Sequence, residues 1–163
     1  MLKQEIREAL ENTIEICEIH FLRITWALDQ CLAFSPLTYQ IYIELKPEQI
    51  AYIDQYVFRF AKFQDIIGNK LFRLILKALD EDPDGLPFRD ILNRLEKLNL
   101  ITDRDSWIVL REARNELAHE YPTSIDETID ALNTLFKNYE PLIKIYKNCI
   151  SFIKKYMIKP EEV

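Results

Sequence analysis

The sequence predicts an all-α protein that folds as an antiparallel bundle of four or five helices. Only two glycines occur among 163 residues, which leaves little material for the tight turns of a β-sheet. Apolar residues recur every three or four positions over long stretches, which is the period of a helix with one buried face. The apolar fraction of 48% and the charged fraction of 29% are typical of a globular domain. We therefore treat residues 1–163 as a single domain.

The first helix is predicted over 2–33, because apolar side chains form a stripe along it. The residues of this stripe are Ile6, Leu10, Ile14, Cys17, Phe21 and Ile24. Pro36 breaks the pattern, so 34–49 is expected to be a connector with room for a short extended stretch. Pro47 suits the first turn of a second helix, which the pattern continues to about Leu79.

The second helix carries a basic stripe opposite a broad apolar face. At about 100° per residue, five basic residues fall within about 80° of one another. They are Arg59, Lys62, Lys70, Arg73 and Lys77. The stripe is a candidate surface for an RNA backbone, and a solvated helix face explains it equally well. On the apolar side, Gly68 would allow a close helix contact, and Gln64 needs a hydrogen-bond partner that an oligomer interface could supply.

Two further helices and a long C-terminal segment complete the prediction. The Asp-, Pro- and Gly-containing stretch 80–87 reads as a loop, 87–99 as a short helix, and 104–119 as a helix capped by Thr102 or Asp103.

The C-terminal segment begins with a capping box of Ser124 and Glu127. Pro141 should kink this last helix or split it in two. Residues 157–163 are expected to form a flexible tail.

Charge and apolar content limit the classes of function. The net charge of -6 opposes long-range attraction of nucleic acid, so any RNA contact needs a local basic patch. The N-terminal stretch has no apolar core of a secretion signal, and no apolar run reaches the length of a membrane span. We expect a cytoplasmic protein without membrane contact. The scattered Cys17, Cys31 and Cys149 lack metal-ligand spacing and are expected to be free, buried thiols.

The stretch "RNELAHEY" places Arg114, His119 and Tyr121 near one helix end, because Pro122 stops the helix at about Tyr121. By spacing alone, an arginine paired with nearby glutamates and a histidine at a helix end account for this stretch. A di-iron centre would use Glu116 and His119 as a Glu-x-x-His unit. The second copy of that unit is absent, so no metal or cofactor is expected.

The motif Arg-x4-His-x-Tyr resembles the signature of the HEPN superfamily, and of its HepT-like toxin branch. The stretches "FRFAKFQDIIGNKLFRLIL", "ILNRLEKLNLI" and "WIVLREARNELAHEYP" also resemble successive helices of small HepT-like proteins. The likeness covers about residues 50–160. It implies a HEPN-like helical bundle that forms a two-fold homodimer.

The resemblance also implies a function. The chain would be the toxin of a bacterial toxin–antitoxin module, a metal-independent endoribonuclease inhibited by an MntA-like minimal nucleotidyltransferase. Arg114 and His119 would be the catalytic pair, with Asn115 as the polar residue that follows the arginine. Tyr121 would be the hydroxyl that some partners adenylylate. The RNA 2′-OH would attack the phosphate and leave a 2′,3′-cyclic phosphate end.

Two other functions remain open from the sequence. The first is a non-catalytic helical partner that docks a minimal nucleotidyltransferase and binds its nucleotide or substrate. The acidic balance and the single histidine of the motif favour that alternative, since acid and base catalysis would need His119 from both subunits or a water molecule. The second is a purely structural dimeric bundle, which leaves the complete motif unexplained.

Overall fold

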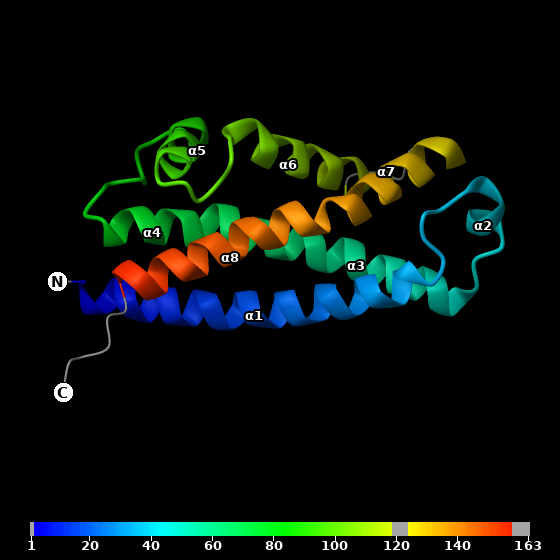
Figure 1. Ribbon diagram of the computed structural model, residues 1–163, viewed down its shortest axis with the longest axis horizontal. Helices are drawn as coiled ribbons and strands as arrows, with labels where there is room; N and C mark the ends of the chain where they lie inside the picture. The colour runs from blue at the N-terminus through cyan, green and yellow to red at the C-terminus, as the bar shows by residue number, and fades with distance from the viewer. Residues whose placement is uncertain (1, 119–123, 158–163) are drawn as a thin grey trace.

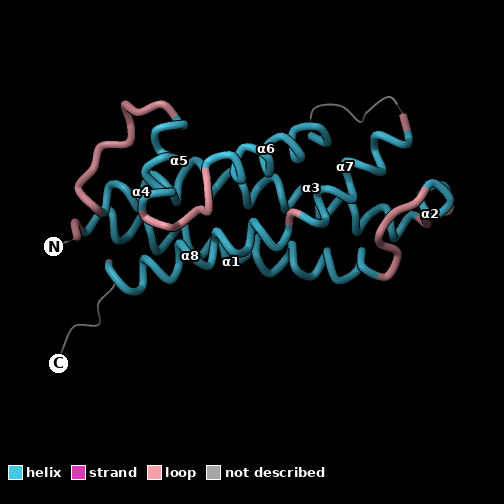
Figure 2. Tube along the Cα trace, turned by 45° about the horizontal axis from the view of Figure 1, so that its top comes forward, coloured by secondary structure: helices cyan, strands magenta, loops and turns pink. Residues whose placement is uncertain are grey.

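The computed structural model describes residues 2–118 and 124–157, and all regular structure in these two ranges is helical (Figure 1). Loops link the helices, and no strand occurs in the part of the chain that is described (Figure 2). The prediction of an all-α protein is therefore confirmed. None of the described helices is long and apolar enough to cross a membrane.

Two long helical rods form the base of the molecule. Helix α1, Gln4–Leu32, runs the length of the molecule, and α3, Pro47–Ile66, returns beside it. Helix α3 continues without a break through the π-helix η1, Ile67–Leu71, into α4, Phe72–Ala78 (Figure 1). The second predicted helix is thus one rod, and its π-helical turn was not predicted.

The connector after α1 contains a helix instead of the expected extended stretch. Helix α2 is Tyr39–Ile43, and the Thr38 hydroxyl accepts a hydrogen bond from the Ile41 amide at 3.2 Å. This N-cap satisfies one of the free amides of the first turn, which favours a helix even in so short a segment. The connector is tied to the rest of the molecule by Asn133, whose side-chain amide exchanges two 2.8 Å hydrogen bonds with the Leu37 backbone.

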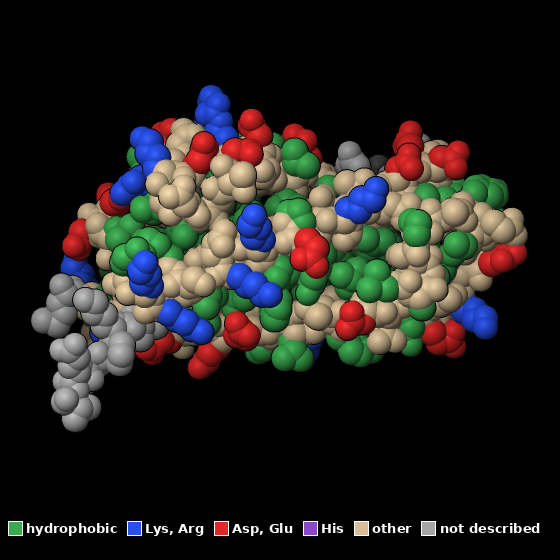
Figure 3. Space-filling model, viewed as in Figure 1, with side chains coloured by type: hydrophobic (Ala, Val, Ile, Leu, Met, Phe, Trp, Pro, Cys, Tyr) green, Lys and Arg blue, Asp and Glu red, His purple; other side chains and the backbone are tan. Residues whose placement is uncertain are grey.

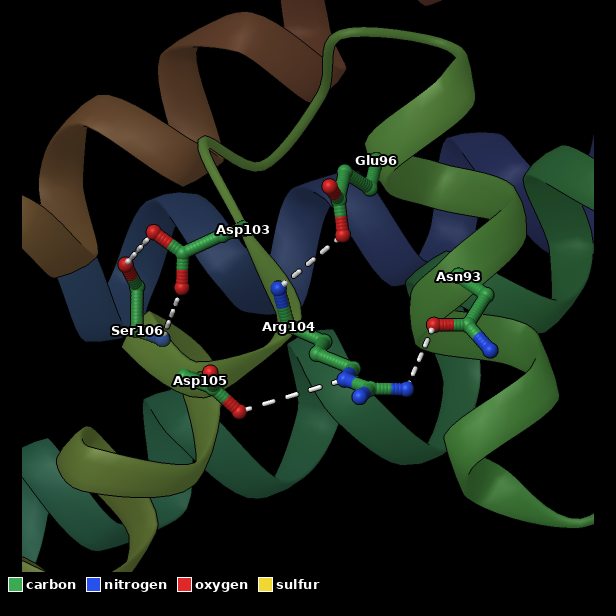
Figure 4. Close-up of polar contacts among 6 residues, drawn as sticks. All are labelled: Asn93, Glu96, Asp103, Arg104, Asp105 and Ser106. Carbon is green, nitrogen blue, oxygen red and sulfur yellow. Dashed lines mark hydrogen bonds and ion pairs between the residues drawn. The ribbon is translucent and has the colours of Figure 1, made fainter.

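Helix α5, Phe88–Lys97, leads through a short turn into α6, Arg104–Ala118, which carries the arginine of the motif. Asp103 caps α6 by accepting a 2.7 Å hydrogen bond from the Ser106 amide, as one of the two predicted caps (Figure 4). Arg104 joins α6 to α5, because its amide donates to Glu96 and its guanidinium to Asn93. These contacts fix where α6 begins.

The C-terminal segment splits into two helices, as predicted, but the break precedes the proline. Helix α7 is Ile125–Lys137 and α8 is Tyr139–Tyr156. Pro141 lies in the first turn of α8, where its missing N–H costs no helical hydrogen bond. The Ser124 hydroxyl caps α7 through the Glu127 amide at 3.1 Å. Met157 is 8% exposed and packs on the core, whereas 158–163, the rest of the predicted tail, lies outside the described residues.

Aromatic side chains and buried thiols fill the space between these helices. Tyr56 is fully buried, and its hydroxyl donates to the Leu135 carbonyl at 2.8 Å, which joins α3 to α7. The three cysteines are free and buried, as expected. Burial raises the pKa of Cys17 to about 12, so this thiol is a core side chain rather than a nucleophile.

Candidate functional site

The arginine of the motif is anchored by an acid on a neighbouring helix. Arg114 lies on α6 with 14% of its side chain exposed, and its Nη1 is 3.0 Å from Oδ1 of Asp65. Asp65 lies in the last turn of α3 and is 44% exposed. No motif or spacing in the sequence pointed to a role for this aspartate. The ion pair holds one side of the guanidinium fork and leaves other donors of the arginine available.

The ion pair lies at a small polar cavity of about 30 Å³ between α6 and the α3–η1 rod. The residues that line it are Gln64, Asp65, Gly68, Asn69, Phe88, Trp107, Arg111 and Arg114. A cavity of this size holds about one water molecule and cannot enclose a nucleotide. Arg111 adds a second cation one turn before Arg114, and its guanidinium carbon is 5.7 Å from the centre of the Phe88 ring.

Several buried polar atoms at this site have no hydrogen-bond partner among the described residues. Gln64 is 2% exposed, and neither its amide oxygen nor its amide nitrogen has a hydrogen-bond partner among the described residues. The same holds for Nε of Arg114. Because Gln64 is buried within a single chain, an oligomer interface is not needed to cover it. Its amide instead lines the cavity beside Arg114.

Replacing Gln64 with leucine should raise the free energy of unfolding by about 1–2 kcal/mol, because a buried amide without partners is exchanged for an apolar group of similar size. Urea unfolding followed by circular dichroism measures the change. The Gln55→Leu variant is the matched control, since Gln55 lies on the same helix and is partly exposed. A Gln64→Leu protein less stable than wild type would mean that the amide is satisfied in solution.

A glycine lets α6 approach the rod closely at this site. A Cβ atom built on Gly68 would lie 3.0 Å from Cζ2 of Trp107, closer than ordinary packing allows. The Trp107 ring also packs on Phe72, with ring centroids 4.8 Å apart. The predicted close contact at Gly68 is therefore confirmed. It falls within η1, and π-helical turns inside helices frequently mark functional sites.

The structure describes only part of the predicted catalytic set. Arg114 lines the cavity, and Asn115, the next residue of α6, is half-buried. His119 and Tyr121 lie outside the described residues, so the distance from the guanidinium to the imidazole is not described.

The predicted basic stripe divides into two groups. Lys77 pairs with Asp84 at 2.8 Å, and Arg73 donates to the Pro83 carbonyl at 2.9 Å, so both hold the loop after α4. Lys70 is exposed and lines the same groove as Arg73 and Lys77. Arg59 and Lys62 instead lie on α3 around Phe58. The uniform spacing assumed for the stripe does not hold beyond Ile66, because hydrogen bonds in η1 span five residues rather than four.

A larger groove lies elsewhere and does not include Arg114. Its volume is about 680 Å³, and it runs between the start of α6 and α8, lined among others by Ser106, Lys144 and Asn148. This face shows apolar side chains between scattered cations (Figure 3). Among the described residues of the predicted catalytic set, neither Arg114 nor Asn115 lines this groove.

Searches for other chemistry and for similar proteins identify nothing further. In the described ranges, no group of three or more histidine, cysteine, aspartate or glutamate side chains could hold a metal ion. Comparisons with family models, curated proteins and solved structures find no match. The chain is thus an all-α protein whose described polar site combines an anchored arginine, a buried amide and a second arginine.

Proposed function

We propose that the chain is a HepT-like toxin of the HEPN superfamily and acts as a metal-independent endoribonuclease. The observation that carries the proposal is the placement of Arg114. Its guanidinium is partly exposed near the end of α6 and is oriented by Asp65 of α3. An arginine that is anchored on one side and has other donors available suits a phosphate that gains charge during reaction.

The proposed reaction uses a nucleophile that RNA itself supplies. The 2′-oxygen forms a bond to phosphorus while the bond from phosphorus to the 5′-oxygen breaks. A base removes the proton of the 2′-OH, and an acid protonates the leaving 5′-oxygen. Arg114 stabilises the charge on the phosphorane oxygens. His119 transfers one of the two protons, and the partner subunit's His119 or a water molecule transfers the other. No cofactor takes part.

A two-fold homodimer of helical bundles would bring two motifs together. We assign its contact to the outer face of α6, where Ile108 is 39% exposed. Asn115 lies seven residues later, two turns along the same face. In the proposed module, an MntA-like nucleotidyltransferase inhibits this dimer. A nucleotide attached to Tyr121 would place bulk and negative charge where the RNA phosphate binds.

A non-catalytic partner of a nucleotidyltransferase is the second candidate. It is favoured by the small exposed fraction of Arg114 and its pairing with Asp65, since a purely structural arginine has the same contacts. The net charge of -6 favours it as well. In this function the helical surface would bind the partner enzyme and its nucleotide or substrate.

Incubation of the purified chain with total RNA in EDTA separates the two functions. The ribonuclease predicts cleavage products with 2′,3′-cyclic phosphate ends, and it predicts that His119→Ala abolishes them. A folded dimer that does not cleave RNA but binds a co-expressed minimal nucleotidyltransferase would support the docking function instead. Loss of cleavage in EDTA with recovery on adding Mg²⁺ would contradict the metal-independent mechanism.

A further inference from the structure

A second cluster of basic residues lies where α1 and α3 meet, away from Arg114. Nη1 of Arg59 is 3.1 Å from Nδ1 of His20, which joins the two helices. Arg23 on α1 and Lys62 on α3 are close enough to act electrostatically on the same imidazole. We call His20, Arg23, Arg59 and Lys62 the α1–α3 cluster.

The hydrogen bond within this cluster defines the state of its histidine. Arginine only donates hydrogen bonds, so Nδ1 of His20 must accept and the proton of the neutral ring is on Nε2. Burial lowers the pKa of His20, and the charges of Arg59, Lys62 and Arg23 lower it further. The hydrogen bond from Arg59 therefore leaves Nε2 of the imidazole as the donor that faces a ligand.

The ion pairs found among the described residues include no cation of this cluster. Nε of Arg59 is buried and has no hydrogen-bond partner there. Three cations held together repel one another, and a chain with an overall charge of -6 has many acids that could have neutralised them. Such an arrangement is favourable when an external anion binds to it.

An exposed aromatic ring lies next to two of the cations, and a second exposed ring lies elsewhere on α1. The Arg59 guanidinium carbon is 5.3 Å and Lys62 Nζ is 5.6 Å from the centre of the Phe58 ring, which is 50% exposed. Trp26 is 51% exposed and meets Tyr52 edge-on, with ring centroids 5.6 Å apart. Cations that bind phosphates beside aromatic rings that stack on bases form the usual surface for single-stranded nucleic acid.

The geometry of α3 connects this cluster to the Arg114 site. Taking about 100° per residue, Lys62 is about 60°, Phe58 about 100° and Asp65 about 120° around the helix from Arg59, all in the same direction. A strand that crosses the outer face of α3 therefore passes from Arg59 over Lys62 and Phe58 to the ion pair of Asp65 and Arg114. The two sites therefore lie on different faces of α3, and a single strand that crosses this helix could contact both.

We propose that the α1–α3 cluster binds a backbone phosphate of the single-stranded RNA substrate, with Phe58 stacking on an adjacent base. The identity of the ligand as RNA rests on the proposed ribonuclease function, whereas the phosphate site itself does not. The cluster holds the strand upstream or downstream of the scissile phosphate, and it supplies the local basic patch that an acidic protein needs to bind RNA.

Nuclear magnetic resonance of His20 tests this site directly. The chain has two histidines, so a His119→Ala protein shows one imidazole signal and leaves RNA uncut. We expect the His20 signal to shift and saturate on titration with inorganic pyrophosphate and with a uridine 12-mer. Arg59→Gln should weaken both interactions at least about tenfold, because a charge-assisted hydrogen bond is lost. Lys97→Gln, an equal charge change at an exposed position on α5, should weaken them less than about twofold.

The outcomes separate the sources of phosphate. Saturation by both ligands with loss in Arg59→Gln supports the proposal. Binding of pyrophosphate without binding of the oligomer would overturn RNA as the ligand, and the absence of any His20 shift would overturn the site. If the His119→Ala protein binds the oligomer but the wild-type protein does not cleave RNA, the ribonuclease function alone is contradicted. Phe58→Ala should weaken the oligomer only, since pyrophosphate has no base to stack.

Discussion

Replacing Arg114 with alanine is expected to lower kcat/KM for RNA cleavage by about 10²- to 10³-fold, the usual loss when one donor to a transition-state oxyanion is removed. Arg114→Lys should recover only part of this loss, because an ammonium keeps the charge but not the fork of two parallel donors. The measurement is the initial rate on a short fluorogenic ribonucleotide in EDTA. The fold should survive, since the partner that loses its ion pair, Asp65, is 44% exposed and can be solvated.

The control for Arg114→Ala is Arg89→Ala, which removes an exposed cation from α5. It should leave the cleavage rate within about twofold of wild type, since surface charges act weakly at a distance in salt. Asp65→Asn gives a second comparison, because it removes the anchor of Arg114 but not the guanidinium. A smaller loss than in Arg114→Ala is expected for it. Equal rates in Arg114→Ala and wild type would remove Arg114 from the mechanism.

Local pattern predicted most of the helices, because each helix depends on its own period and caps. The predicted start of α3 at Pro47 is confirmed. The capping residues Asp103 and Ser124 were identified because a side-chain oxygen just before a helix can accept a hydrogen bond from a free amide of the first turn. The short helix α2 was missed, since five residues do not show a period. The π-helical turn η1 was also missed, because one extra residue in a helix leaves no clear mark in the apolar period.

The candidate site was only partly predictable, because its contacts join residues far apart in the chain. Arg114 was found through a motif, and Gln64 through its polarity within an apolar face. Asp65 was recognisable only as an acid at the edge of that face. Its contact with Arg114 was not predictable, because it depends on how α6 packs on α3. His20 received no role from the sequence, because its hydrogen bond to Arg59 depends on the register between α1 and α3.

Trp107 offers the largest expected effect on stability. Replacing it with alanine should lower the free energy of unfolding by about 3–5 kcal/mol, the usual cost of removing a large aromatic side chain from a core. The ring is 2% exposed and fills the space against Gly68 and Phe72. Urea unfolding of each variant, followed by circular dichroism, gives the change. If the total stability lies at the low end of the normal range for domains, about 5 kcal/mol, this variant will be partly unfolded at 37 °C.

The second tryptophan is the matched control for this prediction. Trp26 is 51% exposed and contacts Tyr52 by an edge, so Trp26→Ala should cost less than about 1 kcal/mol. The two effects should differ although the same atoms are removed, because only the buried position leaves a cavity. Comparable losses in both variants would mean that Trp26 is buried in solution, as it would be if a second copy of the chain covered α1. Trp107→Ala should also reduce cleavage at temperatures where it stays folded, because α6 then loses the contact that sets the position of Arg114 against Asp65.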